Sequence, residues 1–534
     1  MINMKIFLTS VFVSTLFASI VPAAVAADDW SGAEWIAWRP QEVWKTEWDA
    51  RKQKEMAAPR REGDGFPFKT QSGVPLWDLY AFHESPYDAA PIFRRELLVQ
   101  KKITSAQVKI CGLGLHELTI NGKRVGDHQL DPAWTDYASR VFYVTHDVTQ
   151  YLHEGGNAIG VMLGRGFYGL LSNDAWNTER AIWLGQPKLL LKLQVQYEDG
   201  TREEIVSNSE WKVAGGPIVY DCPRRGEIFD ATREQAGWDT PGFDDSGWES
   251  AQIAPAPSGK LVPQDIPPIR ELQAVKAVSF SEPSPGVYVY DFGKNISGWA
   301  RIQLKGKVGE RVLIRYSEKS SRADFFCDNL AIHQEHAWIL DGKESVLEPR
   351  FSYVSFRYLR VSGSSDPLTK DSVEAVMVHT DLETTGTFEC SNPMLNQLHE
   401  AIRLTQLNNT HGQPTDCPHR EKQGWMGDGL FGAEAAFWQF DMSKLYEKWV
   451  QDMADGQHPN GQLSVFASTI KTPGSHSRLT RRGCRPSGHR RCLKSPGGFM
   501  CNTATNECLK PTTPRSSSSP RVCARRNFQD DRAS

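Results

Sequence analysis

One short stretch of this chain gathers the side chains that acid–base chemistry on a sugar would need. Within thirteen residues it contains three carboxylates, one guanidinium and one indole, namely Asp416, Arg420, Glu421, Trp425 and Asp428. A carboxylic acid can protonate a glycosidic oxygen, other carboxylates can accept hydrogen bonds from sugar hydroxyls, and an indole can stack on a sugar ring. These residue types favour a carbohydrate site, but they could equally form a salt-bridge cluster that only braces a loop.

Proline and glycine interrupt this stretch and predict its backbone. Pro418, Gly424, Gly427 and Gly429 lie within it or at its end, and that density opposes a continuous helix. We therefore expect a loop that runs into a helix beginning near Leu430. Loops held on a rigid scaffold are where catalytic groups concentrate, so a loop suits the proposed chemistry.

The order of these residues matches a known signature. Every fixed position of the pattern Asp-Cys-Pro-x-Arg-Glu-(Lys/Arg)-x-Gly-Trp-x-Gly-Asp is present between Asp416 and Asp428. The stretch resembles the signature of the bacterial α-L-rhamnosidases, glycoside hydrolase family 78. The resemblance implies that Glu421 is the general acid and that Trp425 lines the pocket. It also implies that Asp416, Arg420 and Asp428 bind sugar hydroxyls.

The same resemblance implies a reaction and a difficulty. The family hydrolyses terminal α-L-rhamnosyl bonds with inversion, which requires a second carboxylate roughly 6.5–9.5 Å from the acid so that a water fits between them. In the family this base is a Glu far downstream, and the sequence ends before any such position. Asp416 or Asp428 could replace it only by giving up their sugar contacts. We therefore expect this chain to be inactive, with a non-catalytic carbohydrate-binding remnant as the alternative.

Composition and charge limit the class of protein. The chain has 534 residues, of which 40% are hydrophobic and 23% charged, with a formal net charge of -3. From 475 to 534 there are 13 basic and 3 acidic residues, a local charge of +10, so the remainder carries -13. An acidic body argues against nucleic-acid binding. We expect rhamnose-containing glycosides or polysaccharides as the partners, on the resemblance.

The N-terminus resembles a secretory signal peptide. Lys5 precedes a mostly apolar run from Ile6 to Val21, and Ala24-Val25-Ala26 forms a small-x-small cleavage site. We expect residues 1–26 to be removed, no membrane span afterwards, and a secreted or periplasmic protein.

Short alternating strands dominate the next part of the chain. We expect an extended arm over 27–90, N-terminal β-sandwich modules over 91–260 and a second β-sandwich domain over 266–385. The hairpin dipeptide Asn121-Gly122 and the absence of intervening helical patterns argue for antiparallel pairing. The stretch from 94 to 169 also resembles the family's N-terminal module, a jelly-roll related to sugar-binding modules.

Metal binding has little support in the spacing of residues. Asp239, Asp244 and Asp245 lack the alternation of a calcium loop, and we interpret them as a solvated turn. Some relatives carry a calcium-dependent rhamnose-binding module, but nothing in the spacing supports Asn173 or Asp174 as its ligands. We expect no cofactor and no metal in catalysis, and calcium in the N-terminal module stays possible.

A zinc protein is a weak third alternative. It would use His411, Cys417 and His419, but their spacing is irregular, and Pro418 stiffens the link between two of them.

Helical periodicity begins near 391. Asn392 is a plausible N-cap with Pro393 in the first helical position. Three helices follow from the positions of apolar residues: Leu395, Leu398 and Ile402 in the first; Leu430 to Phe440, apolar nearly all round and expected to be enclosed; and Leu445, Trp449 and Met453, after an Asp441 cap. We expect residues 386–474 to begin an α/α toroid (six-hairpin barrel), which is also the family's catalytic fold.

The last segment differs from everything before it. Residues 475–534 are rich in Arg, Ser, Cys, Pro and Gly without apolar periodicity. Such a composition predicts a disordered basic tail, and we interpret it as the product of out-of-frame translation. The expected fold class is thus a multidomain protein in which antiparallel, jelly-roll-like β-sandwich domains precede the start of an α/α toroid.

Overall fold

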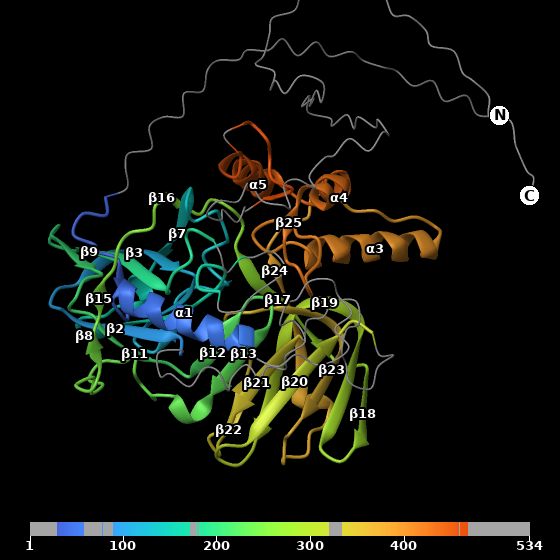
Figure 1. Cartoon of the computed structure of the whole chain (residues 1–534), viewed down its shortest axis with the longest axis horizontal. Helices are drawn as coiled ribbons and strands as arrows, with labels where there is room; N and C mark the ends of the chain where they lie inside the picture. The colour runs from blue at the N-terminus through green and yellow to red at the C-terminus, as the bar shows by residue number, and fades with distance from the viewer. Residues whose placement is uncertain are drawn as a thin grey trace, which may run out of the picture.

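The computed structural model describes most of the chain between 29 and 467. The described residues are 29–57, 77, 89–170, 178, 181–319, 334–458 and 460–467. The expected signal peptide over 1–26 and the tail over 475–534 lie outside them. Among the described residues no helix is both long and apolar enough to cross a bilayer. Figure 1 shows a body rich in strands, with the helices of the 393–455 region gathered on one side of it.

Two sheets pack face to face to form the N-terminal β-sandwich. One sheet contains β1 (Ile36–Ala37), β3 (Ile103–Leu113), β7 (Arg140–Asp147), β9 (Lys188–Tyr197), β10 (Arg202–Val206), β15 (Gln252–Ile253) and β16 (Lys260–Pro263). The other contains β2 (Pro91–Val99), β4 (Leu115–Ile120), β5 (Lys123–Arg124), β8 (Gly155–Gly164), β11 (Lys212–Gly215) and β14 (Glu249–Ser250). Their orders are β15-β1-β9-β3-β7-β16, with β10 on β9, and β14-β11-β2-β8-β4-β5.

The interior of this sandwich is apolar because side chains alternate along its strands. The strand β4 alternates between half-buried and fully buried positions. Phe93, Val161 and Leu191, contributed by both sheets, meet in one buried cluster. The expected Asn121-Gly122 hairpin is present, with both residues at positive φ (53° and 74°), as a type I′ turn requires.

The second β region is built on a larger sheet. Its strands are β6 (His128–Gln129), β12 (Ile218–Cys222), β13 (Gly226–Asp230), β17 (Ile269–Lys276), β18 (Ser279–Ser284), β19 (Val287–Lys305), β20 (Arg311–Ser317), β21 (Glu335–Ile339), β22 (Glu344–Leu347), β23 (Val354–Ser362) and β24 (Val373–Thr380). The order is β12-β13-β21-β20-β23-β19-β24-β17-β6, with β18 and β22 on β19. Single-turn 3₁₀ helices lie at Thr149–Tyr151, Ala231–Arg233 and Lys370–Ser372.

The predicted division into two separate β units needs correction. β12, β13 and β6 all come from the 91–260 range, yet they hydrogen-bond into the larger sheet. β13 runs parallel to β21, with Gly226 opposite Glu335, and β16 runs parallel to β7. The pairing is therefore not purely antiparallel. Strand patterns alone could not show this, because they do not specify which sheet a strand joins.

The expected extended arm contains a helix instead. Residues Gln41–Ala57 form α1, a helix of 17 residues. Trp44 and Trp48 are one helical turn apart and stack with ring centroids 6.0 Å apart, and Trp48 is buried against a cluster that includes Leu170 and Tyr220. The i, i+4 spacing of these indoles was the missed signal.

Three α-helices lie in the described part of the region 386–474, where the sequence predicted them. They are α3 (Pro393–Asn408), α4 (Met426–Gln439) and α5 (Ser443–Asp455), with a short β25 (Gly424–Trp425) to β26 (Phe466–Ala467) pair beside them. Asn392 caps α3 as expected, accepting from the Met394 amide at 3.0 Å. However, α4 begins at Met426, four residues before Leu430, so two of the glycines that predicted a loop lie in its first turn.

The prediction that α4 is enclosed is wrong for the described part of the chain. Leu430, Phe431, Phe437 and Trp438 are 45%, 75%, 54% and 75% exposed. On α3 the periodic apolar residues Leu395, Leu398 and Ile402 are also exposed. In contrast, Leu445 and Trp449 of α5 are buried as predicted.

Candidate active site

The loop between α3 and α4 is closed by its own backbone. The Asp416 amide donates to the Gln423 carbonyl at 3.0 Å, and the Lys422 amide donates to the Cys417 carbonyl at 3.2 Å. Lys422 has φ of 52°, a left-handed conformation that lets the chain reverse before β25. The family-signature residues are thereby folded into a compact turn.

The Glu421 carboxylate is held by two neighbouring side chains. The Trp425 indole Nε1–H donates to Glu421 Oε2 at 2.7 Å, and Arg420 Nη2 lies 3.0 Å from Glu421 Oε1. Trp425 is half-buried and is fixed by an edge contact with Phe466, with ring centroids 5.5 Å apart. The structure therefore brings Arg420, Glu421 and Trp425 together, and the indole holds the Glu421 carboxylate as well as offering a flat surface.

Asp416 lies in the same turn and is also half-buried. Its Oδ1 accepts from the Gln423 amide at 3.0 Å, and its Oδ2 accepts from the Cys417 thiol at 2.9 Å. Burial raises the pKa of Asp416 to about 6, and the negative charges of Glu421 and Asp428 add to this rise. The exposed Asp428 lies in the first turn of α4, where a helix N-terminus favours a negative charge. The charges of Glu421 and Asp428 thus both affect the pKa of Asp416.

Two basic side chains hold this loop against the β strands. One is Arg224, far away in sequence, and the other is Lys422, within the loop itself. Arg224 Nε, in the β12–β13 turn, donates to the Glu421 carbonyl at 2.9 Å. Lys422 Nζ is buried, donates to the carbonyls of Pro223 and Tyr353, and lies 4.0 Å from the Tyr353 ring centroid. Burial lowers the pKa of Lys422 to about 7. The loop is therefore anchored to the larger sheet, at the β12–β13 turn and just before β23.

The sequence offers little sign of these anchors. Arg224 and Tyr353 are far from the loop along the chain, and nothing in their local sequence points towards it. Lys422 did carry a signal, because it occupies the Lys/Arg position of the signature.

We expect Asp416→Asn to remove the loss of folding stability that the wild type shows as pH rises from 4 to 7. A carboxyl whose folded pKa is raised from 3.8 to about 6 stabilises the folded state below pH 4, and this contribution is lost as pH rises through 6. At about 1.4 kcal/mol per pKa unit, the variant should gain up to ~3 kcal/mol on wild type between pH 4 and pH 7. Urea unfolding across this range measures the difference. A difference that does not change with pH would contradict the prediction.

The zinc alternative is not supported by the geometry. The His411 Nε2 atom bonds to the Val378 carbonyl at 2.8 Å, His419 Nδ1 lies 3.4 Å from Glu318 Oε1, and the Cys417 thiol donates to Asp416. The three side chains thus have different partners. They do not group as metal ligands among the described residues.

The acidic turn near 244 is also occupied by protein groups. Asp245 pairs with the buried Arg94, and Asp244 Oδ1 accepts from the Ser246 amide at 3.1 Å. Asn173 and Asp174 lie outside the described residues, so calcium in the N-terminal module stays a prediction.

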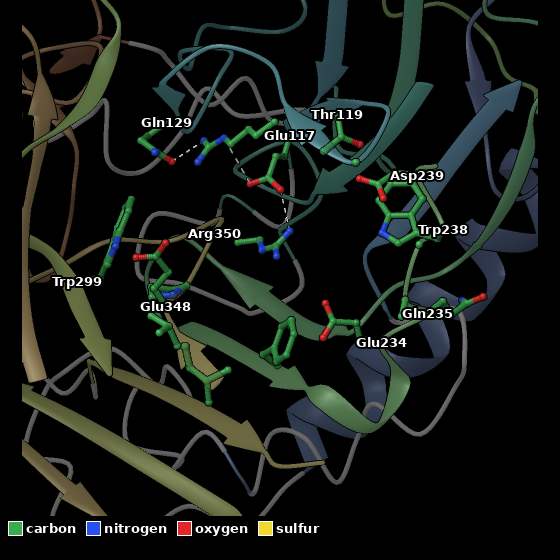
Figure 2. A pocket seen from close by; sticks show the side chains of 18 of the residues that line it. Glu117, Thr119, Gln129, Glu234, Gln235, Trp238, Asp239, Trp299, Glu348 and Arg350 are labelled. Carbon is green, nitrogen blue, oxygen red and sulfur yellow. Dashed lines mark hydrogen bonds and ion pairs between the residues drawn. The ribbon is translucent and has the colours of Figure 1, made fainter. Parts of the chain in front are cut away.

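A cavity of about 410 Å³ lies away from the loop, where the two β regions meet. Figure 2 shows Trp238 and Trp299 on its wall together with Glu117, Glu348 and Arg350. Arg350 Nη1 pairs with Glu117 Oε1 at 2.7 Å across this wall. The Trp299 indole nitrogen is buried and has no hydrogen-bond partner among the described residues. No local pattern in the sequence predicts this cavity.

The fold and the loop together define a class. β domains that precede and brace a helical region, with an acid held by an indole and a guanidinium, are features of a glycoside hydrolase. Three family models match in succession: the α-L-rhamnosidase N-terminal domain over 101–273, the bacterial α-L-rhamnosidase concanavalin-like domain over 281–379, and the bacterial α-L-rhamnosidase six-hairpin glycosidase domain over 383–478. The chain belongs to the bacterial α-L-rhamnosidases, glycoside hydrolase family 78.

Individual relatives agree with this assignment. An α-L-rhamnosidase of Formosa agariphila is 36% identical over 407 residues, covering 73% of this chain and 42% of the relative. The structure of an α-L-rhamnosidase from Dictyoglumus thermophilum has a TM-score of 0.70 at 36% identity, covering 83% of this chain and 46% of that one. The structure of a Streptomyces avermitilis α-L-rhamnosidase with L-rhamnose has a TM-score of 0.67 at 35% identity. The match covers 72% of this chain and 38% of that one. The chain thus spans less than half the length of these relatives.

Proposed function

We propose that this chain carries the general-acid part of an inverting α-L-rhamnosidase. The observation that supports the proposal most directly is the Glu421 carboxylate, held at one oxygen by the Trp425 indole and at the other by Arg420. Two flanking donors fix the direction of a carboxyl that must reach a glycosidic oxygen. A pure bracing cluster would not need an indole donor in a turn built around the family signature.

In this mechanism the carboxylates of the turn have different tasks. Glu421 donates a proton to the glycosidic oxygen as the bond to the sugar breaks. Asp416 and Asp428 accept hydrogen bonds from hydroxyls of the rhamnosyl ring. A separate carboxylate must activate the water on the opposite face, and we assign it to a part of a six-hairpin domain beyond the described residues.

Turnover of a chromogenic α-L-rhamnoside tests this division of labour. We expect activity, with the β-anomer of rhamnose as the first product seen by NMR, from a protein in which residues 29–467 continue into a complete six-hairpin domain. We expect none from the present chain. Turnover by the present chain would place the base within it, and the α-anomer as first product would contradict inversion.

We also propose export of the protein through its N-terminal apolar segment. Expression in a Gram-negative host should yield a periplasmic chain that begins at Ala27, as N-terminal sequencing can determine. A chain retained in the cytoplasm with Met1 intact would contradict this.

Trp425→Phe should lower kcat while leaving KM nearly unchanged. Phenylalanine keeps a ring for stacking but loses the N–H that donates to Glu421. A hydrogen bond to a charged group contributes about 1.5–3 kcal/mol, which corresponds to a decrease of roughly 10–100-fold. Trp425→Ala, which loses stacking too, should in addition raise KM. Steady-state kinetics on the complete enzyme separates the two effects. An unchanged kcat for Trp425→Phe would show that the indole only lines the site.

A second candidate function, carbohydrate binding without catalysis, is favoured by the cavity in Figure 2. Indoles beside carboxylates and guanidinium groups suit a sugar ring and its hydroxyls. Saturation-transfer NMR should detect L-rhamnose on the wild-type chain and lose the signal in Trp238→Ala. Trp438→Ala, which changes an exposed indole on α4, is the matched control. An equal signal in both variants would exclude the cavity as the binding site.

A further inference from the structure

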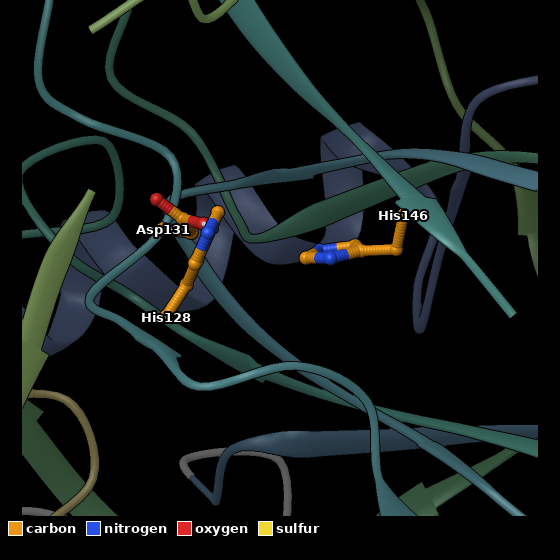
Figure 3. Close-up of side chains that lie close together, drawn as sticks. All are labelled: His128, Asp131 and His146. Carbon is orange, nitrogen blue, oxygen red and sulfur yellow. Dashed lines mark hydrogen bonds and ion pairs between the residues drawn. The ribbon is translucent and has the colours of Figure 1, made fainter. Parts of the chain in front are cut away.

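Three side chains with metal-ligating atoms meet where the N-terminal sandwich adjoins the larger sheet. They are His128 on β6, Asp131 in the loop that follows, and His146 on β7. One imidazole nitrogen from each histidine and one oxygen of the carboxylate all lie within 4.8 Å of one another. Figure 3 shows the His146 ring extending from its strand towards the paired His128 and Asp131. The catalytic proposal uses none of these residues.

Asp131 is held in place as a ligand carboxylate would be. Only 5% of the residue is exposed, and Gln264 Nε2 donates to its Oδ1 at 2.8 Å. Its backbone carbonyl accepts from the His116 amide at 2.8 Å. The other oxygen, Oδ2, lies 2.7 Å from His128 Nδ1. One carboxylate oxygen is therefore fixed by a neighbouring amide while the second faces the imidazoles.

The two histidines come from strands of different sheets, and the fold brings their side chains together. β6 pairs with β17, placing His128 opposite Arg270, and the His128 carbonyl accepts from Arg124 Nη2 at 2.7 Å. The His128 and His146 ring centroids are 5.3 Å apart. A Cβ atom on Gly126 would lie 3.3 Å from both Cε1 and Nδ1 of the His146 ring, and Gly126 has φ of 70°. A glycine in this turn leaves room for the ring.

We propose that His128, Asp131 and His146 bind one Zn²⁺ ion, with water as a fourth ligand. Two imidazole nitrogens and one carboxylate oxygen are a common three-ligand set for zinc, whereas calcium and magnesium prefer oxygen ligands throughout. Tetrahedral zinc with ligand distances of about 2.0–2.2 Å places two ligand atoms about 3.3–3.6 Å apart. Ligand atoms that lie up to 4.8 Å apart therefore need to close by about 1.2–1.5 Å, which rotation of the half-exposed imidazoles can supply.

The ion would join β6, its following loop and β7, and so tie the larger sheet to the sandwich. β6 is an edge strand of the larger sheet and only two residues long. A short strand contributes few backbone hydrogen bonds, so a metal bridge would add to its hold on the sandwich. We assign the site a structural role.

Cobalt substitution tests the site in the full chain, prepared without an affinity tag. Co²⁺ in a nitrogen and oxygen site absorbs in the visible region but lacks the near-ultraviolet thiolate-to-cobalt band. This distinction matters because cysteines occur both in the body and between 484 and 523. We expect one equivalent of Co²⁺ to give visible bands without the thiolate band, and one equivalent of Zn²⁺ to bleach them and raise the Tm.

Variants then assign the ligands. His128→Ala and His146→Ala should each abolish the visible bands, and Gln264→Ala, which frees the Asp131 carboxylate, should weaken Zn²⁺ affinity by roughly 10–100-fold. His153→Ala, at an exposed histidine of the same sandwich, is the matched control and should bind as wild type does. Binding that persists in His146→Ala, or a wild-type chain that takes up no Co²⁺ without thiolate bands, would overturn the proposal. Circular dichroism of each variant establishes that the sandwich is folded.

Discussion

Replacing Glu421 with glutamine is expected to lower kcat on unactivated α-L-rhamnosides by about 10²–10⁴-fold, the typical contribution of a general acid. The variant keeps the shape of the side chain, so the Trp425 N–H can still donate to its amide oxygen. The sugar contacts proposed for Asp416 and Asp428 remain, so substrate binding should change little. Steady-state kinetics on a protein with a complete six-hairpin domain measures both quantities.

Two comparisons make the Glu421 test specific. A substrate with a good leaving group needs less protonation, so its kcat should fall much less than that of an alkyl rhamnoside. Glu447→Gln changes a carboxylate that is 74% exposed on α5 and should leave kcat unchanged. Near-normal turnover of an unactivated substrate by Glu421→Gln would remove Glu421 from the role of acid.

Gly429→Ala is expected to destabilise the helical region by about 1–3 kcal/mol, as overpacking typically does. A Cβ at this position would lie 2.2 Å from Cη2 of the Trp449 ring, and that ring is only 4% exposed. The ring cannot withdraw without displacing α5 from α4. Chemical denaturation, followed by tryptophan fluorescence, measures the loss.

Gly427 supplies the matched control, two residues earlier in the same helical turn. A Cβ there meets nothing within 4 Å. Gly427→Ala should therefore stabilise the protein by about 0.5–1 kcal/mol, the usual gain in helix propensity. Equal effects of the two substitutions on stability would show that the close approach of Trp449 is not the reason for a glycine at position 429.

Several features could be read from the sequence because they depend on neighbouring residues. The turn at Asn121-Gly122 and the cap at Asn392-Pro393 are local in this sense. The signature from Asp416 to Asp428 identified the family, and its Arg420, Glu421 and Trp425 do meet in the structure. Burial of Leu445 also followed from periodicity. Interactions within a few residues are encoded in local order, so local patterns suffice to predict them.

Other features were decided only by the tertiary structure. Arg224 and Tyr353 hold the loop between α3 and α4 from positions 197 and 69 residues away from their partners. β12 and β13 join the larger sheet although they lie within the range predicted for the sandwich. His128 and His146 likewise become neighbours only when β6 and β7 are brought together. Strand pairing over long sequence separations depends on which faces and edges the folded body leaves available, and no local pattern of residues records that.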